Sequence, residues 1–260
     1  SMAYRRLLEL QQRRGITSTS IRVIEHNQAV EYADYLTVLG NQFTQSTYSY
    51  AGKPIFRLPV PAPNVRSPRS AKNFSACRNR FLWLGSGGLV HKGLDLVLEV
   101  FSETADFELV VCGPLDAPSE KGFVEAFHRE LFETRNIQVV GWVDVESEQF
   151  EKVASGCCAL IYPSCSEGQA GSVITCLQAG MIPMVSYESG VDVDGFGTML
   201  EGCSHEQIKK ALAELAGKSN EELAALSFRA HDYAKRNHST ESYLRAFDQV
   251  IQEIEKGEGG

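Results

Sequence analysis

The sequence lacks a hydrophobic run long enough to cross a membrane. No apolar stretch approaches the ~20 residues that a membrane-spanning helix requires. It also lacks a surplus of basic residues, because its 260 residues carry a formal net charge of −8. An acidic chain is repelled by the phosphates of nucleic acids. We therefore expect no transmembrane segment and no nucleic-acid partner.

The seven cysteines lack the spacing of a metal or redox site. None of them forms a Cys-x-x-Cys pair, their number is odd, and the sequence shows no signal peptide. We expect reduced thiols, mostly small core residues, in a cytoplasmic protein. The one alternative is a nucleophile at Cys165, which lies in a polar turn but has no histidine near it in the sequence.

A regular alternation of short apolar runs and amphipathic stretches begins at Arg80. This alternation predicts an α/β fold with a doubly wound, parallel, Rossmann-like sheet. The predicted strands span 80–84, 107–112, 137–140, 159–162 and 184–186. The predicted helices span 93–101, 121–133, 147–155, 172–179, 205–216, 221–237 and 239–256.

The composition divides the chain into four parts. Residues 1–62 contain two predicted helices (4–14 and 22–35) and two predicted strands (35–39 and 54–60), which is little for an independent folding unit. We expect this part to be the tail of an upstream α/β domain or an appended subdomain. Prolines and small and basic residues mark 63–79 as a linker. Residues 80–256 form the predicted ligand-binding domain, and 257–260 a loose tail.

The first candidate site is the turn that follows the strand at 80–84. Gly85, Ser86 and Gly87 allow the backbone to approach a ligand closely. His91 and Lys92 stand at the mouth of the next helix, where the helix N-terminus and the lysine both attract phosphate. The pattern matches neither a Walker loop nor GxGxxG. The alternative is an ordinary glycine turn with a solvated lysine.

Two further turns follow the next two strands. Gly113 ends one strand, where it either lets a ligand pass close to the backbone or simply terminates the strand. After the other strand, Gly141, Trp142 and Val143 offer a flat aromatic face for a nucleobase, with core or loop packing of the tryptophan as the alternative.

The fourth candidate is the polar turn from Pro163 to Ser172, between an apolar strand and a helix. Glu167 is the only carboxylate between Val153 and Glu188, and it could accept hydrogen bonds from sugar hydroxyls. The alternative is a surface acid or a helix cap. Because the carboxyl ends of parallel strands share one edge, we expect all four turns to converge there. The remaining histidines lie on charged segments and are expected to be exposed: His26, His128, His205, His231 and His238.

Taken in order, these segments resemble the C-terminal, donor-binding domain of a GT-B glycosyltransferase of the retaining group 1 (family 4) class. The matching stretches are 85–93, 113, 141–143, 163–168 and 180–185. The resemblance covers about residues 80–254. Residues 4–60 resemble the end of the N-terminal, acceptor-binding domain of such enzymes.

The resemblance implies that Glu167 contacts the donor sugar and Lys92 the diphosphate, as the catalytic pair. The implied donor-binding set is Gly85, Ser86, Gly87, His91, Lys92, Gly113, Gly141, Trp142, Val143, Glu167, Gly168, Gln169, Ala170, Gly171, Ser172 and Thr175. Two of these depart from the family pattern, which has an arginine near Ser86 and a second glutamate in place of Thr175. Each departure removes a charge-assisted hydrogen bond worth about 1.5–3 kcal/mol, so we expect weaker or altered donor binding.

The resemblance implies transfer of a sugar from a nucleotide-diphosphate sugar to a glycan or lipid-linked acceptor, in polysaccharide biosynthesis. A lysine and helix N-termini can neutralise the leaving diphosphate, so we expect no metal and no cofactor. Asp192 and Asp194 have Asp-x-Asp spacing, but they lie in a glycine-rich loop that we place near the donor pocket. Peripheral membrane contact stays open. We expect this chain alone to bind the donor without turnover.

Two other functions remain compatible with the sequence. Ser86 and Thr175 favour a non-catalytic nucleotide-sugar-binding or scaffold domain of the same fold. A sugar-nucleotide epimerase of related fold would require catalytic acids and a histidine that the sequence does not place.

Overall fold

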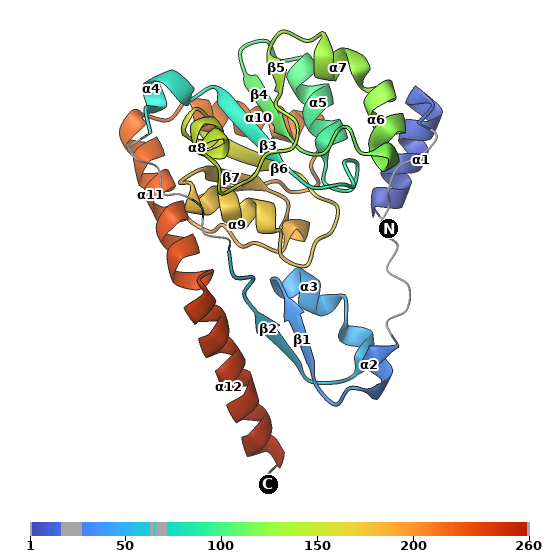
Figure 1. Cartoon of the computed structure of the whole chain (residues 1–260), viewed down its shortest axis with the longest axis vertical. Helices are drawn as coiled ribbons and strands as arrows, with labels where there is room; N and C mark the ends of the chain where they lie inside the picture. The colour runs from blue at the N-terminus through green and yellow to red at the C-terminus, as the bar shows by residue number, and fades with distance from the viewer. Residues whose placement is uncertain (1, 17–27, 63–64, 66–71, 259–260) are drawn as a thin grey trace.

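The computed structural model of the chain describes residues 2–16, 28–62, 65 and 72–258. These residues form a large lobe around a six-stranded parallel sheet and a small lobe around a two-stranded parallel sheet (Figure 1). The predicted α/β, Rossmann-like architecture is therefore confirmed.

The large sheet has one reversal in its winding. Its strands lie in the order β5-β4-β3-β6-β7-β8, and every neighbouring pair is parallel. The strands are β3 (Arg80–Leu84), β4 (Glu108–Cys112), β5 (Ile137–Val139), β6 (Ala159–Tyr162), β7 (Ile182–Val185) and β8 (Thr198–Met199). The reversal falls between β3 and β6. In open α/β sheets, ligands bind beside such a reversal, at the carboxyl ends of the strands.

Helices cover both faces of this sheet, which explains why its central strands are apolar throughout. Phe81, Leu82 and Trp83 of β3 are all completely buried. The covering helices are α4 (Phe74–Cys77), α5 (Leu94–Ser102), α6 (Lys121–Ala126), α7 (His128–Phe132), α8 (Glu148–Ser155), α9 (Gly171–Gln178), α10 (His205–Ala216) and α11 (Asn220–Asn237).

The predicted elements differ from the structure in a few places. The single helix predicted at 121–133 is two helices, α6 and α7. They meet at Phe127, whose side chain is completely buried against the Phe123 ring with centroids 4.6 Å apart. The sequence analysis also missed β8, and α4 lies inside the segment expected to be a linker. Of the helix predicted at 22–35, only α2 (Ala29–Tyr32) is helical among the described residues, 33–35 are not helical, and 22–27 lies outside the described residues.

The small lobe consists of β1 (Leu36–Leu39), β2 (Ile55–Leu58), α2 and α3 (Gln42–Ser46). The last helix, α12 (Thr240–Glu258), leaves the large lobe and packs along β2 (Figure 1). The first helix, α1 (Met2–Arg14), instead lies on the large lobe, where Arg14 pairs with Glu99 of α5. Within the described ranges, every helix is too short or too polar to span a bilayer.

Candidate functional site

Four turns from separate parts of the chain meet at the carboxyl edge of the large sheet. The turns after β3, β4 and β5 and the first turns of α9 line one cavity of about 170 Å³. Its predicted site residues are Gly85, Ser86, Gly113, Trp142, Val143, Ser172 and Thr175. The turns after β3, β4 and β5 and the start of α9 thus meet at one edge as expected, whereas Lys92 and Glu167 are not among the residues that line this cavity. The ligand roles assigned to the residues stay predictions.

Two glycines of this edge make room for a buried ring. A Cβ on Gly85 would lie 2.5 Å from the indole of Trp83, and a Cβ on Gly113 would lie 2.9 Å from both that ring and the carbonyl of Gly85. Both turns therefore require glycine for packing. Gly141 differs, because it has a φ of +83° with open space where a Cβ would be.

Trp142 is available to a ligand. Its exposed fraction is 69%, so it is not packed in the core. An exposed indole face at the wall of a cavity is a surface on which a nucleobase can stack. Thr175 lies deeper, with only 4% exposed, and lines the same cavity.

Lys92 and Glu167, distant in sequence, form a nearly buried ion pair. Lys92 Nζ lies 2.5 Å from Glu167 Oε1, and the exposed fractions of the two side chains are 7% and 13%. The Tyr162 hydroxyl donates to the same oxygen at 3.0 Å, and Ser164 Oγ lies 3.4 Å from it. The alternatives of a solvated lysine and of a surface acid at Glu167 are therefore wrong. A ligand phosphate would compete with Glu167 for Lys92.

His91 joins the turn after β3 to the loop after β6. Its carbonyl accepts hydrogen bonds from the Cys165 amide at 2.8 Å and from Ser164 Oγ at 3.2 Å. Its ring Nε2 contacts the carbonyl of Ser166. The segment Pro163–Ala170, called the site loop below, is thus held against the Lys92 turn.

The small lobe also holds the site loop, through residues that the sequence analysis missed. A Cβ on Gly40 or on Gly190 would collide with the carbonyl of Gly168, so two glycines with positive φ enclose this peptide. Thr44 Oγ1 donates to the same carbonyl at 2.7 Å. Gln169 accepts from the Val60 amide at 2.6 Å. No sequence signal links Gly40, Thr44 and Val60 to the site loop, because these contacts span more than a hundred positions.

The N-terminus of α9 has no side-chain cap. The N-cap residue is Ala170, whose methyl side chain cannot accept a hydrogen bond, and Gly171 and Ser172 follow it. The Val173 amide donates to the Ala170 carbonyl at 3.0 Å. An N-cap side chain that accepts nothing leaves the two earlier amides to other partners, and the helix dipole attracts anions. This end of the helix adjoins the cavity through Ser172.

The sequence analysis also missed a carboxylate, that of Glu120, which lies behind the glycine-rich turn after β3. Glu120 is completely buried, and its Oε1 accepts from the Gly88 amide at 2.5 Å. A Cβ on Gly87 would lie 3.3 Å from the same oxygen. One amide of the turn is therefore already bound to an anion that belongs to the protein.

Three other candidates are settled by burial and position. Cys165 is buried, burial raises the pKa of its thiol, and Arg6 contacts its sulfur, so it does not have the environment of a nucleophile. Asp192 accepts from Asn41 Nδ2 at 3.0 Å and lies outside the cavity wall. The described residues contain no cluster of potential metal ligands. The expectation of an exposed His238 is wrong, because only 1% of it is exposed.

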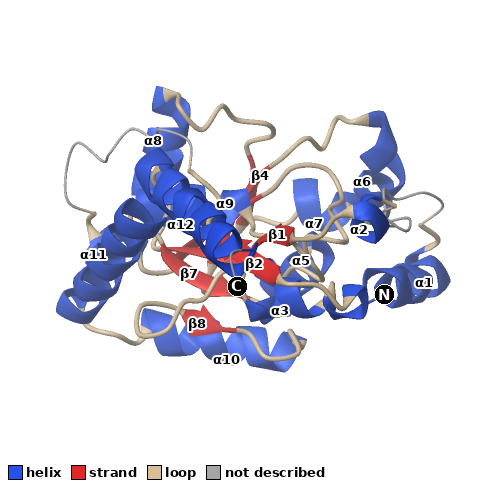
Figure 2. Ribbon diagram, turned by 90° about the horizontal axis from the view of Figure 1, so that it is seen from below, coloured by secondary structure: helices blue, strands red, loops and turns tan. Residues whose placement is uncertain are grey.

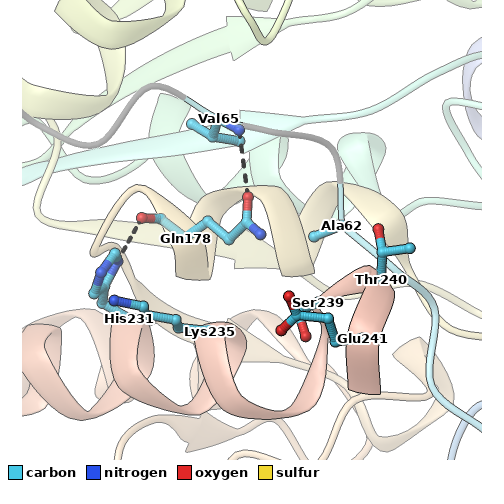
Figure 3. A pocket seen from close by; sticks show the side chains of 8 residues that line it. All are labelled: Ala62, Val65, Gln178, His231, Lys235, Ser239, Thr240 and Glu241. Carbon is cyan, nitrogen blue, oxygen red and sulfur yellow. Dashed lines mark hydrogen bonds between the residues drawn. The ribbon is translucent and has the colours of Figure 1, made fainter. Parts of the chain in front are cut away.

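A second cavity, of about 340 Å³, lies between Ala62 and Val65 on one side and the C-terminal helices on the other (Figure 3). His231 Nδ1 donates to the carbonyl of Gln178 at 2.7 Å, and Gln178 Oε1 accepts from the Val65 amide at 3.4 Å. Gln178 is the last residue of α9, whereas the candidate site adjoins its first turns. This cavity is therefore separate from the four turns.

No protein-family model and no curated protein sequence matches the chain. Solved structures do share its fold. Sucrose-phosphate synthase from Thermosynechococcus elongatus has a TM-score of 0.68 at 12% identity, over 88% of this chain and 60% of that one. HepE from Anabaena, in complex with UDP and glucose, has a TM-score of 0.63 at 10% identity, over 86% and 64%. A TarM mutant from S. aureus, in complex with UDP and other ligands, has 0.62 at 15% identity, over 85% and 45%.

These neighbours are GT-B glycosyltransferases, and the chain shares their fold. The resemblance that the motifs predicted is thereby confirmed at the level of the fold. The chain spans between 45% and 64% of the length of these three neighbours.

Proposed function

We propose that this chain is the donor-binding part of a glycosyltransferase that uses a nucleotide-diphosphate sugar. The observation that carries the proposal is the cavity that brings Ser86, Gly113, Trp142 and Thr175 together beside the reversal of the sheet. In this proposal the nucleobase stacks on Trp142 and the ribose contacts Thr175. The diphosphate lies between the Lys92 turn and the start of α9.

The chemistry expected of this site is electrostatic. Lys92 and the first amides of α9 would stabilise the negative charge that develops on the departing diphosphate. Glu167 would release Lys92 to the phosphate and accept hydrogen bonds from the donor sugar. Tyr162 and Ser164, which already hydrogen-bond the carboxylate, keep it oriented. We propose a retaining reaction on a glycan or lipid-linked acceptor in polysaccharide biosynthesis, in the cytoplasm and without a metal or cofactor.

The neighbours support a donor of this class. HepE is described in complex with UDP-glucose, and starch synthase IV from Arabidopsis thaliana bound to ADP and acarbose. A second candidate, a non-catalytic domain of the same fold, is favoured by Glu120. Its carboxylate already occupies the Gly88 amide, which a diphosphate at this turn could otherwise use.

Titration calorimetry with uridine, adenosine and guanosine diphosphates tests donor binding. We expect one of them to bind, and Trp142→Ala to weaken that binding about tenfold, because stacking on an aromatic ring contributes about 1–3 kcal/mol per base. Phe228→Ala is the matched control, since Phe228 has the same exposed fraction of 69% but lies on α11. Absence of binding at millimolar concentration, or equal affinities in the two variants, would contradict the proposal.

Turnover separates the two candidate functions. Hydrolysis or transfer of the sugar from the matching nucleotide sugar supports the transferase. The non-catalytic domain is supported if the nucleotide sugar binds tightly but no nucleotide is released. The same result is then required of a longer protein that has the length of the neighbours.

A further inference from the structure

A groove separate from the candidate donor cavity lies between the small lobe, the site loop and the C-terminal helices. Its volume is about 570 Å³, which is the size of many small-molecule sites. Its walls come from the turn before α3, the end of β2, the loop after β7 and the junction of α11 and α12. Figure 2 shows α12 and β2 close together in this region, where the two elements are in contact.

Three arginines line this groove: Arg57 of β2, Arg236 near the end of α11 and Arg245 of α12. Arg236 pairs with Asp232 on its own helix. Within 2–16, 28–62, 65 and 72–258, neither Arg57 nor Arg245 makes an ion pair. This concentration of positive charge opposes the net charge of −8 of the whole chain. A guanidinium group without a carboxylate partner can bind an anion.

The rest of the lining favours an anion as well. Among the described residues, Asp192 is the only acid in the lining, and its Oδ1 is already hydrogen-bonded to Asn41 Nδ2 at 3.0 Å. Gln249 adds a neutral amide that can donate hydrogen bonds, and Asn237 retains a second amide hydrogen beside the one that it donates to the Tyr233 carbonyl. Guanidinium groups match phosphate oxygens in geometry and charge, and two unpaired ones balance a phosphate dianion.

His238, which also lines the groove, contains a buried polar atom without a partner. Its Nδ1 donates to the Val60 carbonyl at 2.9 Å, whereas its Nε2 is buried and has no hydrogen-bond partner among the described residues. Burial lowers the pKa of this histidine, so the ring is neutral and Nε2 is an acceptor. Buried hydrogen-bond acceptors rarely lack a partner in folded proteins. A ligand hydroxyl would satisfy this one.

We propose that this groove binds a phosphate-bearing ligand, held by Arg57 and Arg245 with help from Arg236. The groove and the candidate donor cavity share no lining residue, so the proposal does not rest on glycosyl transfer. Gln169 of the site loop lines the groove, two positions after Glu167. A ligand here would therefore touch the loop that carries the candidate catalytic carboxylate.

Titration of the whole chain with inorganic phosphate tests the site. The readout is the NMR signals of the arginine Nε–H groups, recorded at constant ionic strength. We expect saturable shifts at Arg57 and Arg245 that chloride does not produce. The double variant Arg57→Gln/Arg245→Gln should bind phosphate about tenfold more weakly or worse, because it loses two charge-assisted contacts. Arg229→Gln, at an exposed position of α11 outside the groove, should bind as the unmodified chain does.

Shifts that rise linearly without saturation, or equal binding by the double variant and Arg229→Gln, would overturn the proposal. Repeating the titration with uridine diphosphate present keeps the two proposals apart. Failure to bind the nucleotide with intact phosphate binding would contradict the donor site alone. Loss of phosphate binding with intact nucleotide binding would contradict the groove alone.

Two further probes identify the source of the phosphate. One is a hexose monophosphate, and the other is phosphatidylcholine vesicles that contain about 20 mol% phosphatidic acid. Binding of the hexose monophosphate alone supports a soluble ligand. Sedimentation with the vesicles that the double variant abolishes supports a lipid headgroup. Failure of both probes overturns the proposal.

Discussion

At the scale of single residues, the ion pair of Lys92 and Glu167 links the two most informative motifs of the sequence. The pair is nearly buried and is supported by hydroxyls of Tyr162 and Ser164. Such a pair contributes little net stability when intact, because desolvation offsets the attraction. Removing one partner, in contrast, leaves an uncompensated charge inside the protein. The pair is therefore best tested by changing each partner separately and then both together.

Lys92→Met should lower the free energy of unfolding by about 3 kcal/mol, because the Glu167 carboxylate then stays buried without its cation. The double variant Lys92→Met/Glu167→Gln should recover a large part of this loss. Urea denaturation of the single and double variants measures both effects. Equal stability of the single and double variants would show that the two side chains do not interact.

Gly190 is predicted to be the least tolerant glycine of the site region. Gly190→Ala should destabilise the protein by more than about 2 kcal/mol, because a Cβ would strike the Gly168 carbonyl and φ is +74°. Gly195→Ala is the control, since its φ of +77° is similar but no atom lies within 4 Å of the added Cβ. Thermal unfolding compares the two variants. Equal losses would mean that strain at positive φ, and not contact with the site loop, explains the effect.

At the scale of elements, α1 is fastened to the large lobe by charge. Arg6 pairs with Asp95 of α5, and Arg14 pairs with Glu99 and Glu130. Burial opposes the charge of Arg6, but the Asp95 carboxylate outweighs it, and the pKa of Arg6 is raised. Arg6 also contacts the sulfur of Cys165, so α1 reaches the site loop.

Arg6→Met should therefore destabilise the protein by about 3 kcal/mol, since Asp95 has an exposed side-chain fraction of only 3%. Arg5→Met is the control, because Arg5 is its exposed neighbour on the same helix. Chemical denaturation should separate the two variants clearly. Similar midpoints would contradict the assignment of Arg6 as the residue that docks α1.

Elements with a strong local pattern could be predicted from the sequence. The strands β3 and β6 and the helix α10 were predicted with their observed bounds, because buried apolar runs and capped amphipathic stretches are local signals. The break at Phe127 and the two-residue β8 could not be predicted in this way. The first depends on packing against α1 and Phe123, and the second on pairing with β7.

The candidate site, too, could be predicted only in part from the sequence. Glycine turns after strands predicted which loops meet at the sheet edge, because parallel strands place their carboxyl ends together. The partners of those loops could not be predicted. Glu120, Gly40 and Gly190 are brought to the site by tertiary packing, and nothing near them in the sequence marks a contact.

At the scale of the whole molecule, the two lobes are joined at the site loop and along α12. Gly40 and Thr44 of the small lobe contact Gly168, and His238 connects the end of α11 to the segment after β2 through Val60. The junction therefore includes a neutral, buried histidine. Its protonation would place an uncompensated charge at the contact between the lobes.

This junction predicts a pH dependence of stability. Because burial lowers the pKa of His238, the unfolded chain takes up its proton first as the pH falls through about 6.5. The stability contributed by the neutral ring is complete above that pH and declines below it. His238→Asn, which retains a donor for Val60, should make the thermal midpoint depend less on pH between about pH 7 and pH 5. Unchanged slopes in the variant would assign the pH dependence to other groups.

A crystal structure of the protein soaked with the nucleoside diphosphate that binds best tests the central claim most directly. The account predicts the base against Trp142, the ribose near Thr175 and the phosphates beside Lys92 and the start of α9. Nucleotide bound at the arginine groove, or at the cavity between Val65 and the C-terminal helices, with the cavity at the sheet edge empty, would contradict it.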